Sequence, residues 1–469
     1  MLTLYTSSKV DFIFIVCYAL FSVIFYIFIS AFTVPEYDSA DYLLNARNWV
    51  LDKDLSSSFR PPLISWIIAC IWTITGENWI IIKYAIPSFS LAAGLFLYLH
   101  LRKYKGSIFA FGVVALTLLN AKVFFWSTQI LTEGLSLFFL ILTLSFIKSD
   151  KKNYWLLAGI MIGLTFASRY PIAIQAITIF IVESFIRKDI RLILRTLAGA
   201  VPTIILVILA VYLKTGTFSG AIPEDTQFSF PPSLFYVSNW ADIWGYAFLF
   251  IPIAFLFKRT WKDKYNYTFI MWFLVALVFW SSNASNYQER FIIQFAPAAY
   301  FLVVLAIENI TRVNVSNKLK TAILVATLSV ITFGIIHVGM SNISEFNSIQ
   351  SSQGSFYYDK KFVPIMDNIS NIVPHNDTIV MSFNSTSLLD YFIQSELEIP
   401  YGVYSLQSLQ EYMIKNDRRW LLVYENVSHT KSLNPLFSKE GLKNLEGFFQ
   451  KISEFSTEDQ SRFHLYKLK

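Results

Sequence analysis

The stretch DFIFIVCYALFSVIFYIFISAF at residues 11–32 decides the fold class, because it carries no charge after Asp11. A helix of about 20 apolar residues crosses the ~30 Å hydrocarbon core of a membrane. No small-residue cleavage site follows the stretch, so we expect a retained membrane span and not a signal peptide. Directly after it comes an acidic segment, Glu36-Tyr37-Asp38-Ser39-Ala40-Asp41-Tyr42, which we expect at the membrane boundary.

The composition extends this interpretation to most of the chain. The 469 residues are 55% hydrophobic, 17% aromatic and only 15% charged, with a formal net charge of +6. Apolar runs of membrane-spanning length recur along the sequence, which predicts an all-α polytopic membrane protein. Short loops hold most of the basic residues, so the positive charge indicates membrane orientation and not a nucleic-acid partner.

Eleven membrane spans are expected from these runs. They cover residues 11–32, 79–101, 107–126, 131–147, 154–167, 172–186, 193–213, 234–257, 267–281, 291–307 and 321–340. The apolar run at 63–75 is too short to span upright, so we expect it to lie in the interface within an outer loop, residues 33–78.

Basic residues gather in five loops that alternate with the other loops. These loops cover residues 102–105, 148–152, 187–195, 258–264 and 312–320. The positive-inside rule makes this side cytoplasmic. It places the N-terminus in the cytoplasm of a multi-pass cell-membrane protein, and the loop at 33–78 and the C-terminal region outside.

The chain changes character after residue 340. Residues 341–469 are more polar and contain β-type runs at 378–383, 420–424 and 463–467 and a helical run at 406–415. This pattern predicts a small extracytoplasmic α/β domain following a membrane domain at residues 1–340.

Charged residues are concentrated at the predicted outer ends of the spans. A charge inside a span costs about 2.5–3.5 kcal/mol on insertion scales, so such charges are functional candidates. The candidates are Asp38, Asp41, Arg60, Lys83, Lys122, Glu133, Arg169, Glu289 and Arg290.

Structural interpretations compete with function for several of these residues. Lys83 and Lys122 can extend to lipid headgroups. Asp41 can cap a helix that begins near Tyr42, and this is its favoured role. Arg169 and Arg290 can pair with Glu133 and Glu289 to hold helices together.

The candidates suit one kind of chemistry. No serine or cysteine nucleophile constellation is visible, and no residue spacing supports a divalent metal, although one remains possible. Arginines hold a phosphate in a dry pocket, and a carboxylate can take a proton from a hydroxyl. Nucleotide donors are absent outside the cell, so we expect a lipid-linked phosphate donor.

Several motifs resemble those of GT-C type membrane glycosyltransferases, in particular the protein O-mannosyltransferase and aminoarabinose-transferase-like group. Asp38-Ser39-Ala40-Asp41-Tyr42 with Ala46-Arg47 resembles the first outer-loop motif, although the family usually has glutamate at the position of Ser39. Arg60-Pro61-Pro62-Leu63 resembles the element that follows it. Thr132-Glu133, Gly163-Leu164 with Ser168-Arg169, and Glu289-Arg290-Phe291 with Pro297-Ala298 resemble later motifs.

The resemblance implies roles for five residues. Asp38 would be the catalytic aspartate, Glu133 a second acidic site residue, and Arg60, Arg169 and Arg290 contacts to the lipid phosphate. The implied reaction moves a sugar from a polyprenyl phosphate to a hydroxyl of a protein, lipid or glycan acceptor.

Three other functions remain open. A transporter or flippase would carry charges near the bilayer midplane and broken helices at repeat interfaces. An oligosaccharyltransferase-type enzyme would be expected to have a larger C-terminal domain. A non-catalytic relative is compatible with Ser39.

Overall fold

The protein is described by a computed structural model. The described residues are 2–33, 37–53, 55, 60–216, 235–282, 289–313, 316–351, 362–374, 377–381, 391, 393, 396–398, 406–425, 444–456 and 462–469.

Contacts between residues divide the chain into two compact units. Unit 1 comprises Met1–Thr33 and Ala46–Ser344, and unit 2 comprises Val34–Asn45 and Glu345–Lys469. The helix α2 (Tyr37–Val50) crosses the division, so its first residues group with unit 2 and its last residues with unit 1.

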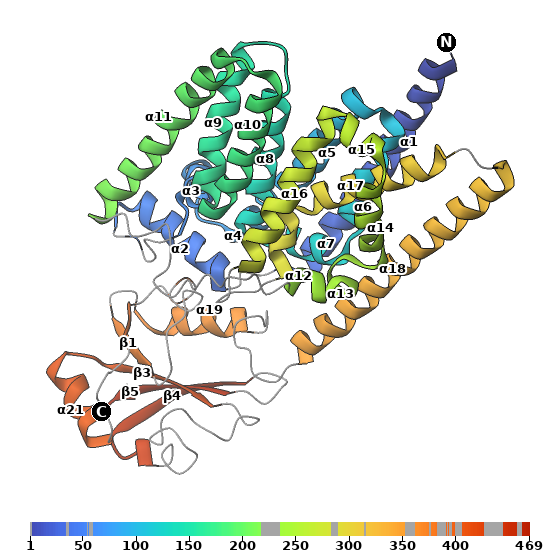
Figure 1. Ribbon diagram of the computed structural model, residues 1–469. Coiled ribbons are helices and arrows are strands. Elements are labelled where there is room, and N and C mark those ends of the chain that lie inside the picture. Colours follow the sequence, from blue (N-terminus) through green and yellow to red (C-terminus); the bar gives the residue numbers. More distant parts are fainter. Residues whose placement is uncertain are drawn as a thin grey trace. The chain divides into compact units, whose positions relative to one another are not determined.

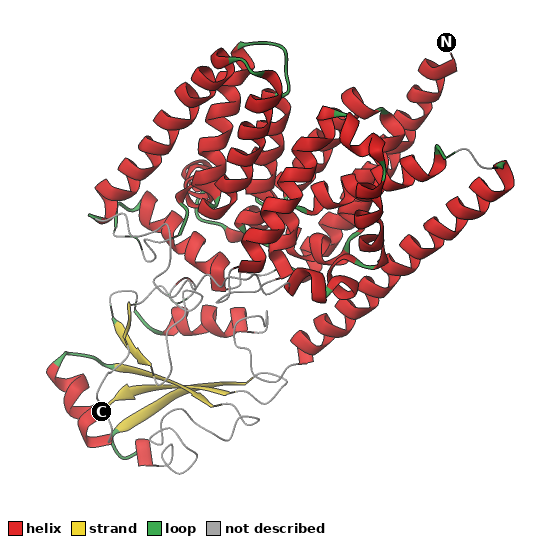
Figure 2. Ribbon diagram, in the orientation of Figure 1, coloured by secondary structure: helices red, strands yellow, loops and turns green. Residues whose placement is uncertain are grey.

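All the regular secondary structure in the described residues of unit 1 is helical (Figures 1 and 2). Its longer helices are α1 (Leu2–Phe32), α3 (Pro62–Thr75), α5 (Ser88–Lys105), α6 (Ser107–Leu119), α8 (Thr132–Ile147), α9 (Asn153–Ser168), α10 (Ala173–Arg187), α11 (Ile190–Thr215), α16 (Lys264–Ser282), α17 (Ala296–Thr311) and α18 (Asn317–Ser351), whose residues after Ser344 group with unit 2. Its shorter helices are α4 (Trp79–Ala85), α7 (Ala121–Ser127), η1 (Tyr170–Ile172), α12 (Phe235–Ser238), α13 (Trp240–Trp244), η2 (Tyr246–Leu249), α14 (Phe250–Leu256), α15 (Lys258–Lys262) and η3 (Glu289–Gln294).

The described helices support several membrane crossings. Five are long and apolar enough to span, or six if α6 and α7 count as one bent span. Shorter apolar helices of 10–17 residues coincide with other predicted spans, among them α8, α9 and α17. The run at 63–75, predicted to be interfacial, forms the short apolar helix α3.

Several predicted spans are not the continuous helices that we expected. The run at 79–101 is divided between α4 and α5, and the run at 291–307 between η3 and α17. The run at 107–126 bends by 71° between α6 and α7. Asn120 causes the break: its Oδ1 accepts from the backbone N–H of Val123 at 3.0 Å and caps α7, while its Nδ2 donates to the Ile243 carbonyl at 2.9 Å. The run at 234–257 is divided among α12, α13, η2 and α14.

Loops predicted to share one side of the membrane meet at one end of unit 1. Lys105 pairs with Asp263, and Lys148 pairs with Glu183. The Arg187 guanidinium donates to the Lys148 carbonyl at 2.6 Å. These contacts join the basic loop at 102–105 to that at 258–264 and the loop at 148–152 to that at 187–195. The Tyr104 hydroxyl links the two pairs, because it donates to the Lys148 carbonyl at 2.8 Å.

Unit 2 contains a five-stranded mixed sheet in the order β2-β1-β3-β5-β4. Its strands are β1 (Thr378–Met381), β2 (Glu396–Glu398), β3 (Trp420–Glu425), β4 (Phe449–Ser456) and β5 (Arg462–Leu468), and its helices include α19 (Phe362–Ile372) and α21 (Leu406–Lys415). β1 pairs in parallel with β2 and β3, and β5 pairs antiparallel with β3 and β4. The predicted α/β character of this region is confirmed.

Candidate active site

Three charged side chains from separate parts of the sequence meet in unit 1. Arg169 Nη1 donates to Glu133 Oε1 at 2.8 Å and to Thr132 Oγ1 at 2.9 Å. Arg290 Nε lies 3.4 Å from the same Glu133 oxygen. Glu133 is completely buried, whereas the arginine side chains are 13% and 12% exposed. The carboxylate therefore lies inside, and the two arginine side chains remain partly exposed. We call these three residues the ion cluster.

Local structure explains why these side chains converge. Glu133 lies in the first turn of α8, where the helix dipole favours a negative charge. Arg169 follows the last residue of α9 and has an extended backbone, with φ −163° and ψ 106°. Arg290 lies in η3, which packs against α8. Two helix ends and a short 3₁₀ helix thus bring together residues 157 positions apart, from 133 to 290.

An aromatic layer lies against the ion cluster. Trp280 and Phe291 stack with ring centroids 4.1 Å apart. The Arg169 guanidinium carbon is 4.8 Å from the Phe291 centroid and 5.9 Å from that of Trp280. Arg290 also lies over Phe291, at 5.6 Å. Aromatic faces attract cations, so the rings help to hold both guanidinium groups in place.

Lys83 differs from the expectation that it extends to lipid headgroups. Its side chain is buried, and Nζ donates to the Ser30 carbonyl at the end of α1, at 3.2 Å. The ammonium also lies 5.6 Å and 5.3 Å from the ring centroids of Trp79 and Tyr84. Its apolar surroundings are protein side chains, so the headgroup interpretation is wrong for Lys83. Lys122 is likewise buried, at 3% exposed.

The predicted role of Asp41 as a helix cap is wrong. α2 begins at Tyr37, so Asp41 lies within the helix and does not cap a helix that starts near Tyr42. The helix starts before the residue near Tyr42 at which we expected it to begin. Asp38 lies in its first turn, where the helix dipole favours a negative charge.

The predicted residues of the outer loop fall in both units. Asp38 and Asp41 belong to unit 2, and Arg60 belongs to unit 1, where it precedes α3. The meeting of Asp38 with the ion cluster stays a prediction. Glu289 opens η3, but its side chain lies outside the described residues.

The end of α2 is fixed in unit 1 by two ion pairs. The Arg47 guanidinium donates from Nε to both Glu77 carboxylate oxygens, at 3.0 and 3.1 Å. Lys214 Nζ donates to Asp52 Oδ1 at 2.6 Å, and this hydrogen bond, together with the lysine's charge, lowers the pKa of Asp52. The Ala-Arg motif thus contributes a bidentate contact, which favours one geometry.

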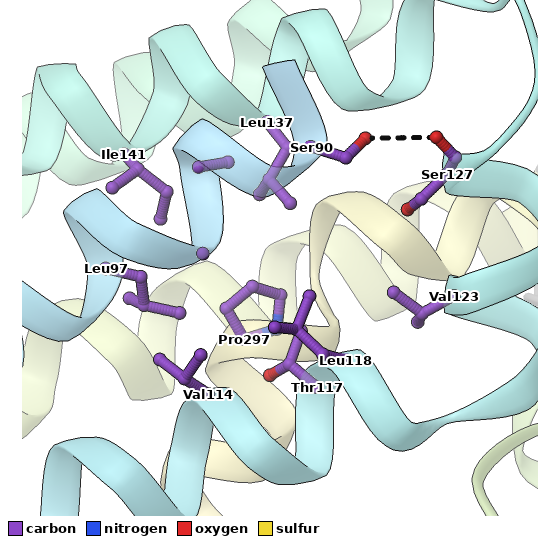
Figure 3. A pocket seen from close by; sticks show the side chains of 12 residues that line it. Ser90, Leu97, Val114, Thr117, Leu118, Val123, Ser127, Leu137, Ile141 and Pro297 are labelled. Atoms are coloured by element: carbon purple, nitrogen blue, oxygen red, sulfur yellow. Dashed lines mark hydrogen bonds between the residues drawn. The ribbon is translucent and has the colours of Figure 1, made fainter. Parts of the chain in front are cut away.

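A small cavity lies among α5, α6, α7, α8 and α17 (Figure 3). Its volume of about 10 Å³ is roughly what one water molecule needs. Most of its lining is apolar, and the Ser90 hydroxyl donates to the Ser127 carbonyl at 3.4 Å on one side. None of the predicted site residues lines it, so it has no part in the candidate site.

The described side chains form no cluster typical of a metal site. Among the residues that the structure describes, no group of three or more histidine, cysteine, aspartate or glutamate side chains could hold an ion.

Comparisons with known proteins agree with this architecture. Residues 59–214 match the family described as dolichyl-phosphate-mannose-protein mannosyltransferase. This segment includes Arg60, Glu133 and Arg169. No curated protein matches the chain.

Solved structures match over nearly the whole chain. ArnT from Cupriavidus metallidurans in the apo state has a TM-score of 0.66 at 12% identity, covering 97% of each chain. The arabinofuranosyltransferase AftD from mycobacteria has a TM-score of 0.62 at 12% identity, covering 97% of this chain and 40% of its own. The oligosaccharyltransferase of Archaeoglobus fulgidus, in its apo form, has a TM-score of 0.56 at 11% identity, covering 92% and 70%.

These matches agree on one architecture, that of a helical multi-pass membrane protein. The chain has the fold of the GT-C type membrane glycosyltransferases, and the resemblance to that group predicted from its motifs is confirmed.

Proposed function

We propose that this protein transfers a sugar from a polyprenyl phosphate to an acceptor hydroxyl at the outer face of the membrane. The observation that carries the proposal is the ion cluster of Glu133, Arg169 and Arg290 in a GT-C fold. Two partly exposed arginine side chains backed by a buried carboxylate offer a fixed positive site for a phosphate.

The similar known proteins support a polyprenyl-phosphate ligand for this chain. A second structure of ArnT from Cupriavidus metallidurans, bound to undecaprenyl phosphate, matches this chain with a TM-score of 0.63 at 13% identity. The matched family takes its name from a dolichyl-phosphate sugar. A polyprenyl-phosphate donor in this chain is consistent with both.

The proposed reaction is a single displacement. Asp38 takes the proton of the acceptor hydroxyl, and the oxygen forms a bond to the anomeric carbon. The bond from that carbon to the phosphate oxygen breaks, and its electron pair stays with the departing lipid phosphate. Arg169 and Arg290 stabilise the negative charge that develops on the phosphate. One displacement inverts the anomeric configuration, by analogy with inverting glycosidases.

Glu133 has a supporting part in this scheme. Its Oε1 is already engaged by Arg169 and faces Arg290, and the residue is completely buried. A carboxylate so placed holds the arginines in position and is poorly suited to take a proton from an incoming acceptor.

The Asp38→Asn variant tests the mechanism. The amide keeps the size of the side chain but cannot act as a base, and general-base assistance contributes roughly 10²–10⁴-fold. We therefore expect sugar transfer to fall by about that factor while the lipid donor still binds. Sugar transfer at the wild-type rate by a folded, donor-binding Asp38→Asn protein would show that the proposed base is wrong.

A further inference from the structure

The side chain of Gln294 is unusual among the described residues. It is completely buried, and neither its Nε2 nor its Oε1 has a hydrogen-bond partner among the residues that the structure describes. Among the buried glutamine and asparagine side chains of the described residues, it is the one with both amide atoms unsatisfied. A buried polar group without a partner costs about 1–3 kcal/mol, so such a group calls for an explanation.

The position of Gln294 connects it to the ion cluster. It is the last residue of η3, the 3₁₀ helix that also carries Arg290 and Phe291. A 3₁₀ helix repeats every three residues, so Gln294 lies on the same face of η3 as Phe291. Phe291 is the ring against which Arg169 packs, at 4.8 Å.

Other buried polar atoms without a partner among the described residues belong to the ion cluster and to the aromatic layer against it. Trp280, which stacks on Phe291, is 1% exposed, and its indole Nε1 has no partner within the described chain. The same holds for Nε of Arg169 and for Oε2 of Glu133. Buried donors and acceptors without partners among the described residues are thus found on η3, on the aromatic layer and on the ion cluster, the parts that form the proposed phosphate site.

We propose that Gln294 binds hydroxyl groups of the donor's sugar and thereby helps to select the sugar. The proposal rests on the function given above. A primary amide donates from Nε2 and accepts at Oε1, so it can bind two neighbouring hydroxyl groups at once. Nε1 of Trp280 supplies a further donor. A site built to hydrogen-bond a hydroxyl also rejects analogues that lack it, because its buried polar groups are then left unpaired.

Gln294→Met tests the role, because methionine keeps the length of the side chain and removes both polar atoms. The matched control is Gln175→Met. Gln175 is also buried, at 1% exposed, but its Oε1 accepts from Trp272 Nε1 at 2.8 Å. Without lipid, we expect Gln294→Met to melt at or above the wild-type temperature and Gln175→Met to melt below it, because only the control breaks a hydrogen bond.

Lipid-induced shifts in melting temperature separate the sugar from the phosphate. Polyprenyl phosphate alone is expected to raise the melting temperature of wild type and of Gln294→Met equally. A panel of polyprenyl-phosphate sugars identifies the lipid that wild type transfers. We expect this lipid to raise the melting temperature further than polyprenyl phosphate does, but only in wild type and in Gln175→Met. We also expect the transfer rate of Gln294→Met to fall at least tenfold, and Gln294→Asn, which keeps a shortened amide, to lose the additional shift as well.

Two results would overturn the inference in distinguishable ways. If Gln294→Met and Gln294→Asn keep the full additional shift from the sugar-bearing lipid, Gln294 does not bind the sugar, and the proposed function is unaffected. If neither lipid stabilises the wild-type protein and no lipid of the panel is turned over, the proposed function fails and the inference fails with it.

Discussion

Glu133 illustrates how burial changes the interpretation of a charged residue. The sequence offered it as a second acidic site residue, whereas its carboxylate is fully buried and engaged by Arg169. Breaking a buried ion pair by removing one partner typically costs 3–5 kcal/mol, because the remaining charge is uncompensated. If the proposed function is correct, a substitution at Glu133 changes both the stability of the protein and its binding of the lipid donor.

Substitutions at the ion cluster can separate these two effects. Arg169→Ala leaves Glu133 with Arg290 alone, so we expect a loss of roughly 3 kcal/mol in unfolding free energy together with weaker binding of polyprenyl phosphate. Adding Glu133→Gln removes the buried charge and should restore part of the stability without restoring binding. Denaturant unfolding in detergent and a lipid-binding measurement on both variants check this. Wild-type affinity in the double variant would exclude Arg169 as a phosphate contact.

Individual site residues were predictable to different degrees. Glu133, Arg169 and Arg290 stood out because charges at span ends are costly, and they meet in the structure. The sequence did not suggest the proposed role of Gln294, because an uncharged glutamine in an apolar run gives no such signal. Lys83 was assigned to the headgroups because the sequence does not reveal that Trp79 and Tyr84 enclose its ammonium.

At the scale of helices, the close packing of α9 against α11 depends on two glycines. A Cβ atom on Gly159 would lie 2.0 Å from the Thr196 carbonyl oxygen, and one on Gly199 would lie 2.3 Å from that of Leu156. Both distances are far below van der Waals contact. The two backbones thus approach as closely as small residues allow, an arrangement common between membrane helices. α9 ends one residue before Arg169, so this contact also supports the ion cluster.

Gly199→Ala is expected to force these helices apart. Overpacking typically costs 1–3 kcal/mol, so we expect a lower melting temperature and, because α9 moves, weaker donor binding. Gly339→Ala is the control, since a Cβ there meets nothing within 4 Å and alanine favours a helix. Equal melting temperatures for the two variants would contradict the close contact.

Helices were easier to predict than their interruptions. Hydropathy located α1, α5, α11 and α16 because a long apolar run permits little else in a membrane. The bend at Asn120 was not predicted. Besides capping α7, its side chain donates to the Ile243 carbonyl, more than a hundred residues away. A contact at that distance leaves no local pattern.

At the scale of the whole molecule, the basic loops meet at one end of unit 1. The ion cluster lies at the other ends of the helices α8 and α9 that lead to these loops. The two groups of residues are thus separated along the helices, as the charge pattern predicted. Which end faces the cytoplasm is still a prediction from the positive-inside rule. The division of α2 between the two units was not foreseeable, because contacts and not composition define it.

Thiol labelling in intact cells tests this orientation. In a background with Cys17 and Cys70 replaced by serine, single cysteines are introduced at the exposed positions Lys152 and Lys415. We expect an impermeant maleimide to label the cysteine at 415 and to label that at 152 only after permeabilisation. Labelling of position 152 in intact cells would reverse the topology and move the ion cluster to the cytoplasmic side.

The turnover of lipid donors by purified protein in proteoliposomes tests the central claim most directly. Mass spectrometry would follow a panel of polyprenyl-phosphate-linked sugars with candidate acceptors. The account predicts that at least one lipid releases free polyprenyl phosphate in step with glycosylated acceptor, and that Arg169→Ala and Asp38→Asn both reduce this release. If instead the intact lipid crosses the bilayer with its sugar still attached, and Asp38→Asn moves it equally well, the protein is a flippase and the account is contradicted.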